Sequence, residues 1–490
     1  MLVSLYTSRV VLNTLGVEDY GIYNVVGGVV TMFAFFNSAM SSATQRFLSY
    51  EIGKGDFKQL RKTFNVTQII HIGIAILIFI LAETIGLWFV KTFLVIPPER
   101  LEAAIWVYHF SVLSFMVSVI QVPYNATIIA HERMNVYAYV SIIEVLLKLL
   151  IVFMLTWITY DKLKLYGILH FVVAFFIAAI YRIYTRMNFE ESKFEIVKDK
   201  KLYKTLVSYS GWNLFGNIAG VANGQGVNIL LNMFYGPVVN AARGIAMQVQ
   251  GAVNSFVGNF QMAVNPQIIK SYAADEKEYM TSLIIRSSKF SFYLLYLLSL
   301  PIIIEIDQIL KLWLKTVPEY SSIFTLLILI IILIDCISGP LMTSVQATGK
   351  IKLYQIVVGT LQLFILPISY LFLKLGYSPE ITLYVNIAIS SIALVFRLFF
   401  LRRILNFPSM QFIKEVVLVN IIIVFLTFLI PFYIRYKMDE SVLRLITIVS
   451  VSFIWNIFII YHVGLNKKEK ILIVKGVKQI KFSFKELNLL

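Results

Sequence analysis

Apolar segments separated by short charged or Pro/Gly-rich breaks recur along almost the whole chain. Thr67 to Val90, Val140 to Thr156 with its flanks, and Ile323 to Ile334 with its continuation are examples. A hydrocarbon core of ~30 Å needs a helix of ~20 predominantly apolar residues to cross it. The pattern therefore predicts an all-α integral membrane protein with about 14 transmembrane helices.

The expected spans follow from the breaks between apolar segments. They are residues 1–13, 21–48, 64–92, 103–130, 136–159, 165–187, 207–234, 238–268, 283–312, 321–348, 352–374, 380–404, 412–433 and 442–463. The first is too short to cross a bilayer, so we expect helix 1 to be truncated. No basic stretch precedes it, and we expect no removable signal peptide.

Composition agrees with a membrane protein, because 59% of the residues are apolar and only 14% are charged. Soluble domains carry about a quarter charged residues. The single cysteine, Cys336, excludes an internal disulfide and a cysteine-based metal site. The histidines His71, His109 and His170 have no metal-ligand spacing, and we expect them to pack.

Lysine and arginine are concentrated in alternate loops. By the positive-inside rule, both termini, the basic linker 189–206 and the basic tail 467–490 are expected in the cytoplasm. The net charge of +16 is then mainly a topology signal, with some attraction to anionic lipid. We expect no binding of nucleic acid.

Weak internal similarity predicts a duplication. Pro123 to Tyr137 aligns without gaps on Pro340 to Tyr354, and the Thr44 to Tyr50 and Leu15-Gly16 segments have counterparts at nearly the same offset. Six helices per copy give parallel repeats related by an axis along the membrane normal. The expected parts are an N-lobe (1–188), the linker (189–206), a C-lobe (207–404), two further helices (405–466) and the tail (467–490). The linker is either a hinge between lobes or a solvated loop on lipid headgroups.

One expected helix, 238–268, carries polar or small residues along one face at steps of three and four. This polar stripe comprises Asn240, Gly244, Gln248, Gly251, Asn254, Gly258, Gln261 and Asn265. A weaker copy in 21–48 includes Asn24, Gly28, Ser38, Ser42 and Gln45, and 207–234 adds Asn213, Asn217, Gly220, Gly224 and Asn228. Lipid penalises unpaired amides, so these faces line a hydrated cavity or support close helix packing.

Charged residues within spans favour the cavity. Arg9, Arg46 and Arg243 are suited to bidentate contact with phosphate oxygens, and with the amides they indicate an anionic, hydroxyl-rich substrate. Snorkelling to headgroups is the alternative for Arg9 and Arg46. Among the acids, Glu144 is expected to pair with Lys148, and Asp335 is either a coupling-cation site or a hydrogen-bonded structural residue.

The segments SRVVLNTLGVEDYGIYNVVGGVV (8–30) and SSATQRFLSYEIGKGD (41–56), with the twofold layout of about fourteen spans, resemble a known family. They look like the polysaccharide and O-antigen (Wzx-type) flippases of the multidrug/oligosaccharidyl-lipid/polysaccharide (MOP) exporter superfamily. The resemblance implies export of an undecaprenyl-pyrophosphate-linked oligosaccharide across the bacterial inner membrane by alternating access, for O-antigen, capsular or exopolysaccharide synthesis. It also implies that Arg9, Arg46 and Arg243 meet the pyrophosphate or acidic sugars.

On this interpretation we expect membrane lipids as surroundings, polysaccharide-assembly proteins as candidate partners, a monomer, and no cofactor beyond a coupling proton or sodium ion. The alternatives are a cation-coupled multidrug or small-molecule exporter of the same superfamily, and a lipid II flippase. A membrane glycosyltransferase is not expected, because the loop with Glu18 and Asp19 is too short for a sugar site. We therefore expect a transporter and no enzyme.

Overall fold

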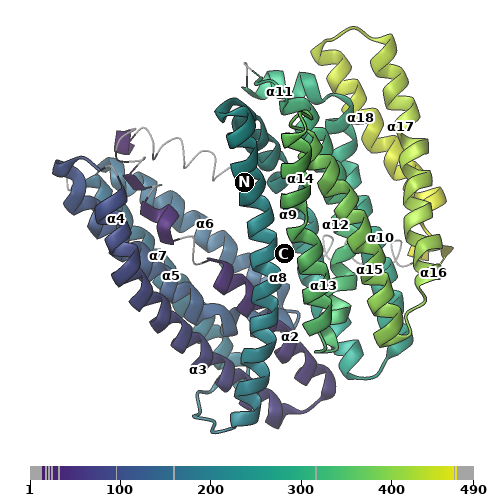
Figure 1. Ribbon diagram of the computed structural model, residues 1–490. Coiled ribbons are helices and arrows are strands. Elements are labelled where there is room, and N and C mark those ends of the chain that lie inside the picture. The colour runs from purple at the N-terminus through teal and green to yellow at the C-terminus, as the bar shows by residue number, and fades with distance from the viewer. Residues whose placement is uncertain are drawn as a thin grey trace, which may run out of the picture. The chain divides into compact units, whose positions relative to one another are not determined.

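The structure is a computed structural model. It describes residues 11, 14–16, 19, 22–23, 26–30, 34–94, 96–157, 161–314, 317–467 and 469–471. Within these ranges the chain forms helices joined by short connections, without any β-strand (Figure 1). The all-α prediction is confirmed.

The N-terminal half contributes six labelled α-helices. A π-helical turn, Ala82–Gly86, joins α3 to α4 without a break in direction. The helices are α2 (Ala34–Lys54), α3 (Phe57–Leu81), α4 (Leu87–Phe93), α5 (Leu101–Ala130), α6 (Met134–Trp157) and α7 (Lys162–Asn188).

The C-terminal half contributes the remaining helices. They are α8 (Lys200–Tyr235), α9 (Pro237–Ala273), α10 (Lys277–Ile304), α11 (Ile306–Leu314), α12 (Ser321–Ala347), α13 (Lys352–Leu363), α14 (Ile365–Lys374), α15 (Ile381–Leu405), α16 (Ser409–Phe412), α17 (Val419–Lys437) and α18 (Val442–Ile459). A π-helical stretch, Ile413–Leu418, connects α16 to α17, and another, Ile460–Gly464, follows α18.

Ten helical segments of the described chain are long and apolar enough to cross a membrane. The helices α8 and α9 are not among them, although they have 36 and 37 residues. Both carry the polar stripes predicted from the sequence, and these residues lower their apolar content. Their surfaces are therefore suited only in part to lipid.

The chain divides into two compact units whose boundaries fall inside helices. Unit 1 comprises 1–222, 262–280 and 343–360, and unit 2 comprises 223–261, 281–342 and 361–490. The ends of α9 and α12 thus belong to the same unit as the N-terminal half. Division by packing differs in this way from division by sequence repeat.

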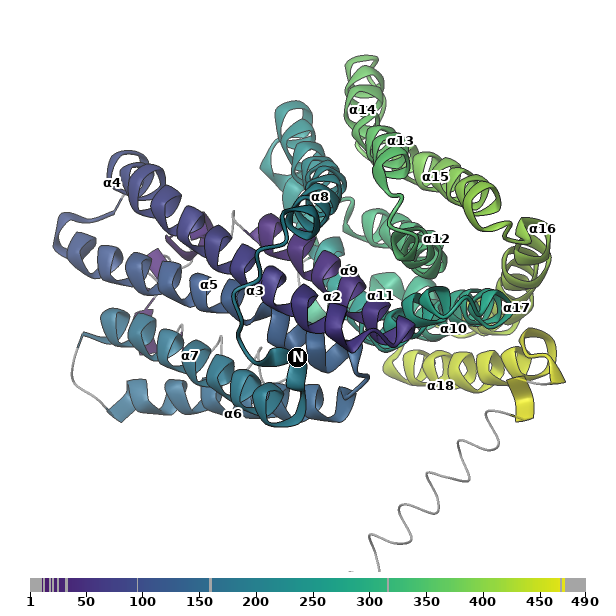
Figure 2. The same ribbon diagram turned by 90° about the horizontal axis from the view of Figure 1, so that it is seen from below.

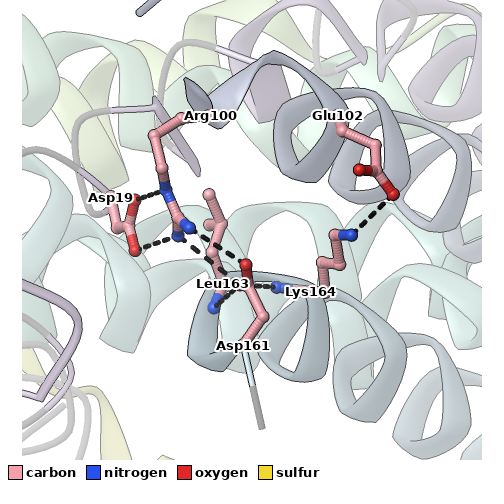
Figure 3. Close-up of polar contacts among 6 residues, drawn as sticks. All are labelled: Asp19, Arg100, Glu102, Asp161, Leu163 and Lys164. Atoms are coloured by element: carbon pink, nitrogen blue, oxygen red, sulfur yellow. Dashed lines mark hydrogen bonds and ion pairs between the residues drawn. The ribbon is translucent and has the colours of Figure 1, made fainter. Parts of the chain in front are cut away.

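Within unit 1, α3, α5, α6 and α7 run alongside one another (Figures 1 and 2). A buried cluster that includes Leu48, Phe64, Tyr124 and Leu155 holds α2, α3, α5 and α6 together. At one end of the unit, Arg100 forms ion pairs with Asp19 and Asp161 (Figure 3). This arginine clip ties the segment around Asp19 to the starts of α5 and α7, and we call this end of the unit the clip end.

At the opposite end of unit 1, the start of the linker folds onto the helices. The ring of Phe189 stacks on His131 with centroids 4.2 Å apart, and Glu191 Oε1 lies 2.6 Å from His131 Nε2. The Asn65 amide donates to the carbonyl of Lys193 at 3.2 Å and accepts from the N–H of Glu195 at 2.7 Å. The stretch 189–195 is therefore fixed by specific contacts. We call this end of unit 1 the linker end.

In unit 2, α17 and α18 are attached to α10 along its length. Tyr296 on α10 bonds to Thr427 at 2.9 Å, and Tyr293 donates to the carbonyl of Gly464 at 3.0 Å. A buried ion pair of 2.9 Å joins Lys289 to Glu469, with 4% and 1% of the side chains exposed. The last two helices therefore form one body with α10.

Candidate functional site

The polar stripe of α9 is open along its middle. Gln248 and Asn254 are exposed, and so are Gly244, Gly251 and Gly258. A Cβ atom placed on any of these three glycines would meet nothing within 4 Å. Glycine that serves close helix packing has a neighbouring helix against it, so these glycines do not have that role here.

Within the described part of the chain, the stripe's side chains form hydrogen bonds to other helices near one end. Gln261 donates to the Ser291 hydroxyl at 3.0 Å and to the carbonyl of Cys336 at 2.8 Å. Asn265, one turn further, accepts a 3.0 Å hydrogen bond from Thr343. These two amides hold α9 to its neighbours, whereas Gln248 and Asn254 leave their amides available. Partly buried Asn240 lies at the other end, and its Oδ1 has no partner among the described residues.

Arg243 lies beside the stripe and is 4% exposed. Its Nη2 donates to the carbonyl of Gly224 on α8 at 3.2 Å, while Nε and Nη1 have no hydrogen-bond partner within the described chain. No carboxylate of the described residues forms an ion pair with it. A buried guanidinium with spare donors and no counter-charge is costly unless an anion completes it. The arrangement can therefore receive an anionic group.

Both asparagines of α8 that were predicted to line the pathway are hydrogen-bonded. Buried Asn213 accepts a 3.1 Å hydrogen bond from Gln355 on α13, and Asn217 donates to the carbonyl of Asn213 at 2.9 Å. The first of these bonds holds α8 against α13 in unit 1, and the second lies within α8. Gly224, nearer the other end of α8, has open space at its Cβ position. A Cβ atom on Gly211 would also meet nothing within 4 Å, whereas one on Gly226 would meet Leu366, so open and packed positions alternate along α8.

Arg46 on α2 is buried, with 6% exposed. Its guanidinium donates to the carbonyls of Gln346 and Ala347 at the C-terminus of α12, at 3.1 and 2.6 Å. The ring of Tyr50 lies below it at 4.7 Å, and that of Tyr209 on α8 at 5.5 Å. Positive charge is stabilised at a helix C-terminus, so Arg46 caps α12 and holds three helices together. We call Arg46, Tyr209, Gln346 and Ala347 the linker-end latch.

Two further contacts close the linker end of unit 1. A Cβ on Gly53 of α2 would lie 2.5 Å from the Cα of Lys270 on α9, so the two backbones touch there. Lys270 also forms a 2.7 Å ion pair with Glu132 at the end of α5. Helix ends from both sequence repeats thus meet around α2.

The remaining predicted residues of α2 are less informative. Ser42 and Gln45 are partly buried, and Gln45 Nε2 has no partner among the described residues. Ser38 lies in α2, but its side chain is outside the described part, as are Arg9 and Asn24 entirely. Their assignment to a substrate pathway stays a prediction.

Asp335 on α12 lies near a basic residue that sequence reasoning missed. Arg397 on α15, which is 3% exposed, acts on its carboxylate electrostatically, and Ser390 on the same helix hydrogen-bonds to it. Arg397 could have been identified as an arginine inside an expected span, 380–404. Because Arg402 and Arg403 follow closely, however, it looked like part of the basic end of that helix. The coupling role of Asp335 stays a prediction.

Comparisons with known proteins place the chain in a family. The sequence profile of a family described as "polysaccharide biosynthesis protein" matches residues 1–266, more than half of the chain. No curated protein sequence matches significantly.

Solved structures share the fold at low sequence identity. A multidrug-resistance MATE-family transporter of the MOP superfamily, in an outward-facing conformation, superposes with a TM-score of 0.68 at 14% identity, covering 83% of this chain and 92% of that one. A MOP-superfamily transporter from Pyrococcus furiosus, described as having a binding pocket of reversed polarity, gives 0.66 at 12% identity, covering 81% and 90%. A MATE transporter in a bent conformation gives 0.67 at 13% identity, covering 84% and 93%.

The family match and the shared fold confirm the resemblance drawn from residues 8–30 and 41–56. The chain therefore belongs to the polysaccharide biosynthesis protein family, and its fold is that of the MOP-superfamily transporters.

Proposed function

We propose that the protein is a flippase that exports an undecaprenyl-pyrophosphate-linked oligosaccharide across the bacterial inner membrane, with both termini in the cytoplasm. The single observation that carries the proposal is the pairing of an open polar stripe with a buried, under-bonded arginine. Gln248 and Asn254 offer amides to sugar hydroxyls, and Arg243 offers donors to a diphosphate. The isoprenoid tail can stay in lipid while the head group crosses, and moving the cargo in this way makes and breaks no covalent bond.

Movement of the cargo by alternating access is supported by the linker end of unit 1. The latch and the Gly53–Lys270 contact join helix ends from both repeats, and Arg46 contributes two hydrogen bonds to that closure. A closure made of a few polar contacts can open and reform, because each contributes only a few kcal/mol at most. Release of Arg46 from α12 is the proposed opening step.

A cell-based depletion experiment tests the substrate class. Cells that make the cognate polysaccharide are depleted of the protein, and lipid-linked oligosaccharides are extracted from each leaflet. We expect the completed lipid-linked repeat unit to accumulate on the cytoplasmic leaflet, and re-expression of the wild-type chain to clear it. Unchanged lipid-linked saccharide with altered drug sensitivity would instead support a cation-coupled drug exporter, and accumulation of lipid II alone would support a lipid II flippase.

A further inference from the structure

An ionisable pair lies inside the spans of unit 1, away from the latch and the stripe. Glu83 Oε1 and His109 Nδ1 are 2.9 Å apart, with 22% and 41% of the side chains exposed. Glu83 belongs to the turn between α3 and α4, and His109 belongs to α5. At 1.5 Å per residue, both lie roughly 12 to 15 Å along their helices from the clip end.

The local backbone is built around this pair. In the π-helical turn Ala82–Gly86, the carbonyl of Ala82 accepts from the N–H of Leu87 and also from the Tyr108 hydroxyl, at 2.6 Å. A Cβ on Gly86 would overlap that hydroxyl. Tyr108 is the neighbour of His109 in sequence. The hydrogen bond from Tyr108 to the π-helical turn therefore also fixes α5, the helix that carries the histidine. Such bulges are rare and occur often at functional sites.

The partner of Glu83 distinguishes it from the other acids deep in the described spans. Glu144 is paired with Lys148 at 2.6 Å, and Asp335 lies near Arg397. Lysine and arginine keep their charge at neutral pH, whereas the unperturbed pKa of histidine lies near 6.5. Of these three acids, only Glu83 is paired with a histidine, the residue type that most readily gains or loses a proton near neutral pH.

Other charges around the pair are remote or compensated. Tyr108 interacts electrostatically with Glu83 and is neutral at physiological pH. At the start of α5, Arg100 is paired with Asp19 and Asp161, and Glu102 with Lys164. Lys91 on α4 is exposed. Within the described residues, no lysine or arginine forms an ion pair with Glu83.

We propose that Glu83 and His109 form a proton-binding site that couples proton movement to the transport cycle, an inference that rests on the proposed transport function. With one proton bound, the pair has no net charge, whether the proton lies on the imidazole beside a carboxylate or on the carboxyl of Glu83 beside a neutral imidazole, and it tolerates a dehydrated environment. When the proton leaves the pair, a net negative charge remains and water is needed to stabilise it. The pair therefore keeps its proton in a conformation that shields the pair from water. It releases the proton in a conformation that exposes the pair to water.

Proton binding is tested without transport by carbodiimide labelling. Dicyclohexylcarbodiimide is apolar and modifies protonated carboxyl groups, and mass spectrometry of the reconstituted full chain quantifies modification at each site. We expect labelling of Glu83 to fall as the pH rises, because the pair loses its proton, and His109→Asn to change this pH dependence. Labelling of Glu83 that is flat between about pH 6 and 9 would overturn the proposal.

Coupling is tested in proteoliposomes with a fluorescent isoprenyl-diphosphate-linked sugar and an imposed pH gradient. We expect the gradient to accelerate flipping severalfold in the wild type and in Glu144→Gln, and to have no effect in Glu83→Gln or His109→Asn. A Glu83→Gln protein that keeps the wild-type response overturns the proposal while leaving the flippase intact. Absence of flipping by the wild type would instead contradict the proposed function, and the labelling result would still report on the proton site.

Discussion

The guanidinium of Arg46 donates a 2.6 Å hydrogen bond to the carbonyl oxygen of Ala347, a residue 301 positions further along the chain. This bond joins the end of α2 to the end of α12 and closes the linker end of unit 1. An arginine inside a predicted span thus binds protein backbone in this conformation. Its proposed role concerns opening and closing, and five predictions follow from this and related contacts.

Replacing Arg46 with alanine is expected to open the linker end. Hydrogen bonds to a charged group contribute ~1.5–3 kcal/mol, so the ratio of open to closed protein should rise about 10- to 100-fold. Accessibility is measured by maleimide labelling of Ser49→Cys, a fully buried position on α2, in a Cys336→Ala background. Arg61→Ala is the control, because Arg61 forms only an exposed pair with Glu195 at the same end. Equal labelling rates in Arg46→Ala and the control would contradict the latch.

Gly53→Ala is expected to hinder closure for a steric reason. The added Cβ would lie 2.5 Å from the Cα and 2.6 Å from the carbonyl oxygen of Lys270, and backbone atoms cannot rotate away. Overpacking of this kind costs ~1–3 kcal/mol. Gly73→Ala on α3 adds the same methyl group where nothing lies within 4 Å. The thermal midpoint in detergent should fall for Gly53→Ala and stay level or rise slightly for Gly73→Ala, because alanine is favoured over glycine inside a helix. Similar midpoints for both would refute the close contact.

Arg243→Met is expected to abolish export without lowering stability. The buried guanidinium has one hydrogen bond and no counter-charge, so its removal relieves an electrostatic cost while taking away the proposed diphosphate ligand. Thermal stability and export are measured on the same preparations. Arg243→Lys is included because it keeps the positive charge but loses the planar guanidinium with its paired N–H donors. A destabilised Arg243→Met protein, or one with normal export, would remove this residue from the proposed site.

Removing only one partner of the buried Lys289–Glu469 ion pair is expected to lower the stability of the protein strongly. Both side chains are almost fully buried, so Lys289→Met alone leaves an uncompensated carboxylate and should cost ~3–5 kcal/mol of stability. The double variant Lys289→Met with Glu469→Leu removes both charges and should recover most of that loss. Unfolding midpoints of the two single variants and the double variant check the coupling. Additive losses would mean that the charges do not interact.

The clip end is expected to lose stability in acid through Asp161. Although partial burial acts to raise it, the pKa of the Asp161 carboxyl is held below its usual value by the backbone N–H of Lys164 and by Arg100. A depressed pKa in the folded state stabilises the protein above the unfolded pKa of about 4, and this contribution is lost as pH falls through the folded value. Asp161→Asn should therefore be less stable than the wild type at neutral pH and equally stable well below pH 4. A difference that persists in strong acid would contradict the ion pair.

The membrane fold could be predicted from the sequence because long apolar runs and their breaks determine it directly. The face of α9 was also predictable, since Gln248 and Asn254 recur with helical spacing. What the sequence left open was whether its glycines pack or face open space, because that depends on neighbouring helices. In the structure, a Cβ atom added to Gly251 or Gly258 would meet nothing within 4 Å outside its own helix backbone.

Features that depend on distant partners could not be predicted. The acceptors of Arg46 are backbone carbonyls, which have no sequence signal, and they lie in the other repeat. Glu83 contacts His109 from within a π-helical turn, which shifts the helical register, and no residue pattern in the sequence predicts that turn. The linker showed its charges in the sequence, but not that Phe189 and Glu191 would bind His131.

The most direct test of the proposed function measures flipping by the purified protein in liposomes. A fluorescent isoprenyl-diphosphate-linked oligosaccharide is placed in both leaflets, and a membrane-impermeant quencher reports the fraction reaching the outer surface. Our account predicts that the wild-type protein moves the probe between leaflets faster than protein-free liposomes and faster than an equal amount of Arg243→Met. A wild-type rate equal to that of protein-free liposomes would contradict it.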